Sequence, residues 1–179
     1  MSKLGKKAIS LPKDSKVAVH GNAVTVSGPK GSEKILFNEK IFTSKVNEKN
    51  EFLISPLKKD KNSSVMWGTY RSLINNAILG VTKGHEKDLE LSGVGFKVAQ
   101  QGDQLKLKLG FSHEAIYKVP KGINVKIEKQ TKINISGTDK ALVSKVASEI
   151  KSLKPVEPYK AKGIKEKNQY VIRKEGKKK

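Results

Sequence analysis

Cysteine is absent from the 179-residue sequence, which excludes disulfide bridges, thiolate-bound zinc and a thiol nucleophile. Long apolar runs are absent too, because none approaches the roughly 20 residues that a helix needs to cross a bilayer. The N-terminal residues Met1 to Lys7 carry charges with no apolar segment behind them, unlike a secretory signal. We therefore expect an intracellular protein without a membrane span.

Arginine and aromatic residues are scarce. Arg71 and Arg173 are the only arginines, although Lys and Arg together number 37 against 17 Asp and Glu, a formal net charge of +20. A compact chain with this charge repels itself, and an anionic partner, either nucleic acid or an anionic membrane, would relieve that repulsion. Lysine suits phosphates better than bidentate contacts to bases, so the composition favours binding a folded nucleic-acid backbone.

Recognisable catalytic motifs are also missing. His20, His85 and His113 lack the spacing of zinc ligands, and there is no phosphate-binding loop or Gly-x-Ser-x-Gly elbow. Gly93-Val-Gly95 resembles the start of a dinucleotide fingerprint, but Val98 stands where glycine is required. The acidic residues are scattered among lysines, and no carboxylate pair stands out. We expect no enzymatic activity, no catalytic residue, no cofactor and no metal.

The first half of the chain has the pattern of strands followed by a helix. Alternating apolar residues at 17–19 and 24–26, on either side of Gly21-Asn22, predict a hairpin, and segments 35–42 and 52–54 predict further strands. After an N-cap at Ser63-Ser64 the apolar spacing becomes helical and continues to Gly84. The predicted buried face of this helix holds Met66, Tyr70, Leu73, Ile74, Ala77, Ile78 and Val81.

A second face of the same helix carries Trp67, Arg71 and Asn75, each four residues apart. The ordinary interpretation is a solvated or sheet-edge face. The alternative is a contact with a partner or with the other domain, which makes Arg71 and Asn75 a possible second contact face.

The second half repeats the arrangement of the first. Segments 89–99 and 105–109 predict a hairpin, 115–119 and 125–127 short strands, and 138–153 a helix. The segment Val24 to Gly28 also matches Ile133 to Gly137, which indicates a duplicated unit. The predicted fold is α+β: two similar domains, each a mostly antiparallel sheet packed with one main helix, plus an extended basic C-terminal tail. The expected boundaries are 1–82, 83–153 and 154–179.

The C-terminal tail has features of a strip that lies along a polyanion. From Lys151 to Lys179 there are 11 Lys and Arg against 3 Glu, a net charge of +8. Pro155 and Pro158 disfavour helix and favour an extended path, and Gly163 permits a turn or a close approach. A disordered basic tail is the alternative, mainly for the last four residues.

Two glycine-rich loops in the second half, 92–97 and 110–113, place cations beside flexible backbone. Glycine allows close approach to a ligand, and Phe96 or Phe111 could pack against a sugar or a base. We interpret both rings as core residues and regard the loops as wholes as the better candidates for contact.

Five segments together resemble one protein family. They read Trp-Gly-Thr-Tyr-Arg-Ser-Leu-Ile-Asn-Asn at 67–76, Leu-Ser-Gly-Val-Gly-Phe-Lys at 91–97, Leu-Gly-Phe-Ser-His at 109–113, Ile-Ser-Gly-Thr-Asp-Lys at 135–140 and Glu-Pro-Tyr-Lys-Ala-Lys-Gly-Ile at 157–164. This order is similar to the bacterial-type large-subunit ribosomal protein six family over essentially the whole chain.

The resemblance implies a structural constituent of the cytoplasmic ribosome that binds large-subunit ribosomal RNA near the sarcin–ricin loop and the stalk base. It implies that neighbouring large-subunit proteins are partners and that translation factors bind nearby. Together with the basic composition, it gives the predicted RNA-binding residues Gly93, Gly95, Lys97, Ser112, His113, Lys154, Tyr159, Lys160, Lys162, Gly163, Lys165, Arg173, Lys174 and Lys177.

Two positions depart from the family pattern. Ala161 stands where the family usually has glycine, so the local backbone or its distance from phosphate is expected to differ, because alanine prefers negative φ. Glu166 replaces a usual aromatic residue, which weakens any stacking there.

The alternatives are a generic nucleic-acid-binding scaffold module, a nucleic-acid enzyme and a peripheral membrane protein. A generic nucleic-acid-binding module would need a row of exposed aromatics. A nucleic-acid enzyme would need a carboxylate cluster that binds metal, and a peripheral membrane protein would need a helix with one strongly basic face and one bulky apolar face. We also expect that deleting 154–179 abolishes RNA association and leaves the fold intact, because the predicted core ends at Leu153.

Overall fold

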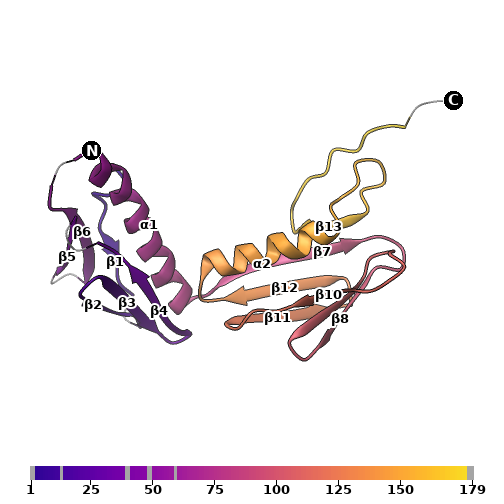
Figure 1. Cartoon of the computed structure of the whole chain (residues 1–179), viewed down its shortest axis with the longest axis horizontal. Helices are drawn as coiled ribbons and strands as arrows, with labels where there is room; N and C mark the ends of the chain where they lie inside the picture. Colours follow the sequence, from indigo (N-terminus) through magenta and orange to yellow (C-terminus); the bar gives the residue numbers. More distant parts are fainter. Residues whose placement is uncertain (1–2, 13, 39–40, 48–49, 59, 177–179) are drawn as a thin grey trace. The chain divides into compact units, whose positions relative to one another are not determined.

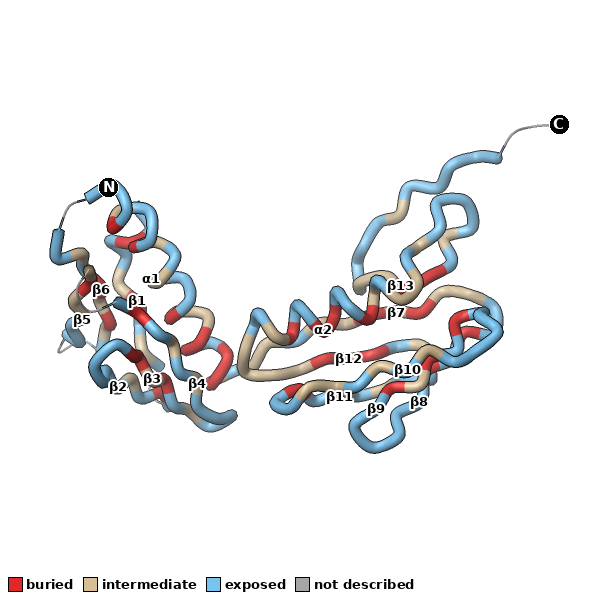
Figure 2. Tube along the Cα trace, viewed as in Figure 1, coloured by how far each residue is buried: buried red, intermediate tan, exposed pale blue. Residues whose placement is uncertain are grey.

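A computed structural model of the chain describes residues 3–12, 14–38, 41–47, 50–58 and 60–176. The chain divides into two compact units. The first holds residues 1–84 with 138–140, and the second holds 85–137 with 141–179. Figure 1 labels most elements of each unit, and Figure 2, which also labels β9, shows which parts of each unit are buried.

The first unit combines one long helix with two three-stranded antiparallel sheets, ordered β1-β6-β5 and β2-β3-β4. Helix α1 contacts β3, β4 and β6, and its buried side chains share one core with both sheets. The elements are β1 (Ile9–Ser10), β2 (Lys16–His20), β3 (Ala23–Gly28), β4 (Gly31–Leu36), β5 (Phe42–Asn47), β6 (Glu51–Pro56) and α1 (Lys61–Thr82).

Helix α1 begins earlier than the N-cap at Ser63-Ser64 predicts. Its N-cap is Asp60, which makes no side-chain capping bond. The Ser63 hydroxyl is buried and lies within hydrogen-bond distance of two backbone carbonyls, 2.7 Å from that of Lys58 and 2.8 Å from that of Asp60. Ser63 therefore ties the first turn to the preceding loop instead of capping the helix.

The buried face of α1 is rotated from the predicted one. Trp67 is only 8 % exposed, and its indole Nε1 donates to the Ile54 carbonyl at 2.7 Å. Met66 and Leu73, predicted to be buried, are exposed. The assignment of Trp67 to a second, outward face is therefore wrong. Arg71 is half-buried, and its Nε donates to the Lys7 carbonyl at 3.3 Å.

The second unit contains helix α2, a four-stranded antiparallel sheet ordered β11-β12-β7-β13 and a three-stranded one ordered β10-β9-β8. Buried side chains of α2 share one core with both sheets. The elements are β7 (His85–Ser92), β8 (Lys97–Gln101), β9 (Gln104–Lys108), β10 (Ala115–Lys118), β11 (Ile123–Glu128), β12 (Lys132–Gly137), α2 (Lys140–Leu153) and β13 (Gly163–Glu166).

The predicted strand 89–99 is in fact two strands. Strand β7 ends at Ser92, a turn follows in which the Phe96 amide donates to the Gly93 carbonyl at 3.3 Å, and β8 begins at Lys97. The hairpin partner of β9 is β8. The glycines of the turn let the chain leave one sheet and enter the other, which the alternating apolar pattern does not reveal.

The repeated Ser-Gly motif has the same role in both units. Gly28 ends β3 and Gly137 ends β12. A Cβ on Gly28 would lie 2.8 Å from the Val81 carbonyl oxygen of α1. A Cβ on Gly137 would lie 2.8 Å from Ile123 Cδ1 and 3.0 Å from Val143 Cγ2 of α2. Glycine thus lets the helix of each unit approach its sheet, and the predicted α+β duplication is confirmed.

Candidate nucleic-acid interface

The start of the predicted tail belongs to the folded core of the second unit. Strand β13 pairs antiparallel with β7, with Ile164 opposite Leu91 and Lys165 opposite Glu90. Ile164 is 0 % exposed and lies in the core cluster. The expectation that the core ends at Leu153 is therefore wrong. Ile164 stands alone between Gly163 and Lys165, so no alternating apolar pattern marks it in the sequence.

Residues 157–163 form a tight turn that presents Tyr159 and Lys160 to solvent. The Glu157 amide donates to the Lys162 carbonyl at 2.8 Å, and the Ala161 amide donates to the Glu157 carbonyl at 3.1 Å. Ala161 has a φ of 54°, in the left-handed region that favours glycine. Tyr159 is 54 % exposed, so its ring is available for contact.

A backbone contact brings the end of the described chain back to this turn. The Lys174 amide donates to the Pro158 carbonyl at 2.9 Å. Arg173 and Lys174 are exposed, as are Tyr159 and Lys160 on the turn. Two segments separated along the sequence therefore present their cations side by side.

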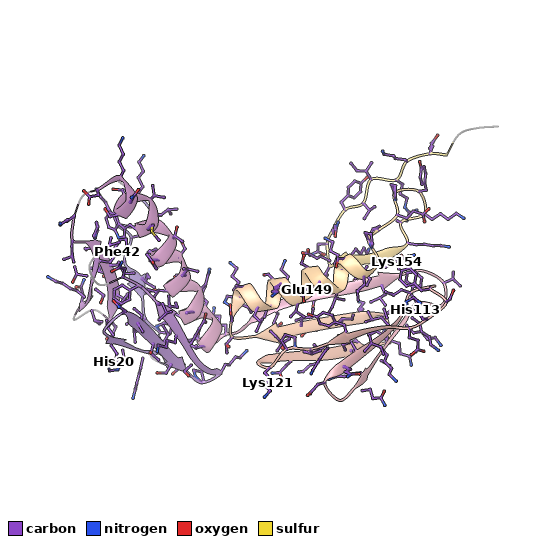
Figure 3. The ribbon with its side chains drawn as sticks, in the orientation of Figure 1. His20, Phe42, His113, Lys121, Glu149 and Lys154 are labelled. Carbon is purple, nitrogen blue, oxygen red and sulfur yellow. The ribbon has the colours of Figure 1, made fainter. Side chains whose placement is uncertain are left out.

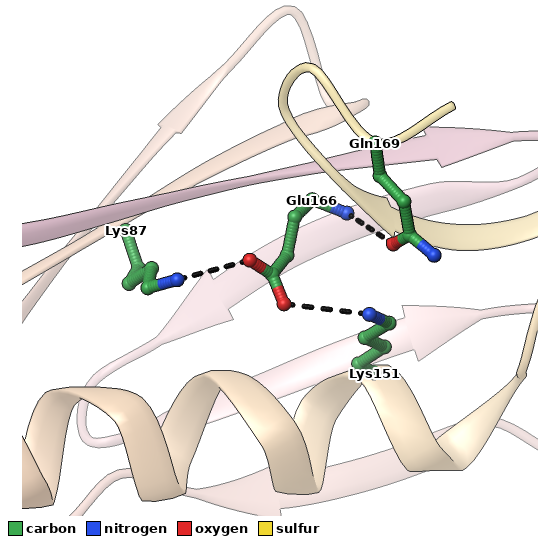
Figure 4. Close-up of polar contacts among 4 residues, drawn as sticks. All are labelled: Lys87, Lys151, Glu166 and Gln169. Carbon is green, nitrogen blue, oxygen red and sulfur yellow. Dashed lines mark hydrogen bonds and ion pairs between the residues drawn. The ribbon is translucent and has the colours of Figure 1, made fainter. Parts of the chain in front are cut away.

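Glu166, at the end of β13, anchors the tail to the sheet and to α2 (Figure 4). Its carboxylate lies 2.9 Å from Lys87 Nζ of β7 and 3.3 Å from Lys151 Nζ of α2. The hydrogen bond from Lys87, reinforced by Lys151, lowers the pKa of the Glu166 carboxyl below its ordinary value, against the opposing effect of partial burial. The Gln169 side-chain oxygen accepts from the Glu166 backbone amide at 3.3 Å.

Two acidic residues of β7 pair with further lysines. Glu90 lies 3.8 Å from Lys132 and 3.4 Å from Lys165, and Asp88 lies 3.2 Å from Lys167. Asn134 donates to Asp88 at 2.6 Å, and this bond is the main reason that the pKa of the Asp88 carboxyl is lowered. Lys165, a predicted RNA-binding residue, therefore also has a structural partner within the chain.

The other predicted cations of this surface differ from Lys165. No carboxylate within the described part of the chain forms an ion pair with Lys97, Lys154, Lys160, Lys162, Arg173 or Lys174. All but Lys154 are exposed, and Lys154 is half-buried. Such unneutralised cations on fixed backbone raise the local positive potential and attract phosphate.

The two glycine-rich loops meet around Phe96. A Cβ on Gly93 would lie 2.9 Å from the Phe96 ring, and one on Gly110 would lie 3.3 Å from it. Phe96 is a core residue, as predicted. Gly93 is therefore needed for internal packing, whereas Gly95, with φ of 78°, has open space around its Cβ position.

Phe111 is not the core residue that the sequence predicts, because its side chain is 45 % exposed. Lys154 Nζ lies 4.4 Å from the centroid of its ring. The His113 ring is stacked with it, at 6.2 Å between centroids and 17° between planes. Figure 3 labels His113, which lies in the loop after β9, and Lys154, which directly follows α2.

Comparison with known proteins identifies the family. The family model described as Ribosomal protein L6 matches the chain twice, over residues 11–84 and 92–167. A large ribosomal subunit protein uL6 from Bartonella quintana is 45% identical over 179 residues, covering 100% of both chains. The protein of the same name from Beijerinckia indica is 41% identical over 100% of both chains. The one from Nitratiruptor is 42% identical over 99% of this chain and 98% of its own length.

The chain belongs to the ribosomal protein L6 family. As a ribosomal protein it is a structural component of the ribosome and not an enzyme, as its sequence predicts. In the part of the chain that the structure describes, no group of three or more metal-ligating side chains is present. Within the same residues, neither helix combines the length and the apolar character needed to span a bilayer.

The structure of this L6-family chain brings together only some of the predicted site residues. The loop residue His113 lies against Phe111, which Lys154 also contacts, and the tail residues 159–162 and 173–174 share the turn described above. Arg71 and Asn75 lie on α1 in the first unit, and Lys177 lies outside the described residues. The sequence analysis named Phe111 as a possible contact but preferred a core position for it, and its exposure now favours the contact.

Proposed function

We propose that this chain is a constituent of the large ribosomal subunit that binds large-subunit ribosomal RNA near the sarcin–ricin loop and the stalk base. There it supports the translation-factor site, beside neighbouring large-subunit proteins and in the cytoplasm. The relatives are named large ribosomal subunit proteins and match the chain over essentially its full length. The resemblance of the tail and loop motifs supports the proposed location.

The observation that carries the proposal is the group of unneutralised cations at the end of the second unit. The tail turn holds Lys160 and Lys162. The hydrogen bond from the Lys174 amide to the Pro158 carbonyl holds Arg173 and Lys174 beside this turn. The ion pairs on β7 use other lysines, so these cations stay available for phosphates. Contacts of this kind position a protein on RNA without reading its sequence.

The proposed mechanism is scaffolding. Each lysine that neutralises a phosphate releases condensed counterions, and the resulting gain in binding free energy falls as the salt concentration rises. The β7–β13 pairing and the Glu166 ion pairs hold the tail backbone in place, so less conformational entropy is lost when RNA binds. The protein's role in this view is to fix the relative position of RNA segments that it touches.

A salt titration with matched variants tests this function. The full-length chain is mixed with large-subunit ribosomal RNA, and the dissociation constant is measured by filter binding. With roughly 6 to 10 phosphate contacts, affinity should fall by about three decades or more between low and moderate salt. A triple variant with Lys160→Ala, Arg173→Ala and Lys174→Ala should bind about tenfold or more weakly, with a salt slope smaller by about 2 to 3.

The control replaces Lys16, Lys34 and Lys45, which are exposed on the first unit, by alanine and so removes the same charge. It should bind nearly as well as the unchanged chain. Equal losses in both triple variants would show that only total charge matters and would overturn the assignment to the tail. Crosslinking within ribosomes should attach the tail to RNA near the sarcin–ricin loop; attachment elsewhere would refute the proposed location.

A further inference from the structure

We propose that the hollow beside Phe111 binds one unpaired RNA nucleotide, whose base lies against the Phe111 ring. This proposal rests on the proposed binding of ribosomal RNA and adds a specific subsite to it. The hollow measures about 500 Å³ and lies between the loop that follows β9 and the segment that follows α2. All of its lining residues belong to the second unit.

The hollow has an apolar floor and an aromatic wall. Phe96 and Leu109, both buried, lie beneath it, and Phe111 and Pro155 line it at the surface. A flat base can bury its faces on such a surface, and stacking on an aromatic ring is the usual way in which proteins hold unpaired RNA bases. A base inside a double helix is already stacked and cannot enter.

The Phe111 ring is held in place while remaining accessible. Lys154 Nζ lies 4.4 Å from its centroid, and the His113 ring is stacked with it. Nearly half of Phe111 nevertheless faces solvent, and the flexible Lys154 side chain can leave the ring face for the phosphate of the bound nucleotide. An aromatic ring in this state costs hydrophobic free energy in the free protein, and covering it with a base recovers that free energy.

The charges around the hollow favour a nucleotide over an apolar protein side chain. Lys154 and Lys162 line the hollow and can pair with the nucleotide phosphate. An apolar occupant would desolvate these ammonium groups without giving them an anion. Glu157 is the sole carboxylate among the lining residues, and it can accept a hydrogen bond from a base amino group.

The test uses the full-length chain and purified large-subunit ribosomal RNA. Phe111→Ala should weaken binding by about 5- to 150-fold, the effect of losing one base stack. Phe111→Tyr keeps the ring and should restore binding to within about twofold of the unchanged chain. Ile116→Ala, which truncates an exposed apolar side chain on β10, is the matched control and should leave affinity unchanged. Circular dichroism checks that each variant is folded.

Chemical modification of unpaired bases in the same RNA locates the nucleotide. The unchanged chain should protect a base that becomes reactive again with Phe111→Ala, while the rest of the footprint persists. If the unchanged chain binds RNA and Phe111→Ala binds equally well with the same footprint, the nucleotide site is refuted and the proposed function stands. If the unchanged chain does not bind this RNA at all, both proposals fall.

Discussion

The ammonium group of Lys87 on β7 lies 2.9 Å from the carboxylate of Glu166 on β13. This contact joins the tail to the strand that it pairs with, and Lys151 of α2 reaches the other oxygen of the same carboxylate. All three side chains are partly exposed, so solvent screens each pair. Glu166 is therefore an electrostatic anchor of the tail in this chain.

Glu166→Gln should lower the free energy of unfolding by up to about 1 kcal/mol near neutral pH, because it removes two partly exposed ion pairs. The pKa of Glu166 is lowered from 4.5 in the folded chain. The stabilisation by the ionised Glu166 carboxylate is therefore fully present above pH 4.5, and it is lost as the pH falls through the lower pKa of Glu166 in the folded chain. The free energies of unfolding of the unchanged and variant chains, measured with urea, should differ near neutral pH and become equal in acid. A difference that grows on acidification would contradict this account.

Ala161→Gly should stabilise the chain by about 0.5–1 kcal/mol. Ala161 has a φ of 54°, and an L-residue in this left-handed region costs roughly 1–2 kcal/mol that glycine does not cost. Glycine is also more flexible in the unfolded chain, which reduces the net stabilisation. Ala161 thus adopts the left-handed conformation although alanine prefers negative φ. The matched control, Ala99→Gly on β8, should destabilise by about 0.5–1 kcal/mol, since glycine weakens a strand. In thermal or urea unfolding, Ala161→Gly should be more stable than the unchanged chain and Ala99→Gly should be less stable.

The repeat was predictable from the sequence because strand alternation and glycine positions are local signals. The segments 24–28 and 133–137 match in apolar spacing and in the glycine that each helix packs against. The orientation of α1 was not predictable, because apolar residues lie on two adjacent faces of it. Trp67 lies in the core and donates a hydrogen bond to the Ile54 carbonyl of β6, and neither contact can be read from the helical spacing.

The candidate site was predictable in its cations but not in its geometry. Lysine density and the prolines identify the tail from sequence. The pairing of β13 with β7 is made by backbone groups, which leave no mark on residue type apart from Ile164. The contact between Phe111 and Lys154 likewise joins residues 43 positions apart in the sequence, and contacts at that separation have no local pattern.

Gly163→Ala should destabilise the second unit by about 2 kcal/mol or more. A Cβ at this position would lie 2.7 Å from both the Pro155 carbonyl oxygen and Val156 Cα, and φ is 142°. Both neighbours are backbone atoms, so the clash cannot be relieved by a side-chain rotation. Gly102→Ala is the matched control, since its φ is 58° and nothing lies within 4 Å of its Cβ position. It should cost only about 1 kcal/mol, and equal losses in urea unfolding would refute the steric argument.

A chain that ends at Leu153 should lose stability, whereas a chain that ends at Gln169 should keep it. The shorter chain lacks Ile164, whose loss from the core should cost about 2–5 kcal/mol. It also leaves β7 as an edge strand that pairs with β12 alone. The longer chain keeps β13 and the Glu166 ion pairs, and the described residues that it loses, 170–176, are exposed or half-buried. Amide hydrogen exchange along β7 should therefore quicken in the chain ending at Leu153 alone.

The same pair of truncations separates folding from RNA contact. Both remove Arg173 and Lys174, so both should bind ribosomal RNA more weakly than the full chain. The chain ending at Gln169 should do so with its β7 amides still protected, because the pairing of Lys165 with Glu90 across the two strands remains. Unchanged urea unfolding of the chain ending at Leu153 would show that Ile164 contributes nothing to the core and that the tail, as first expected, lies outside it.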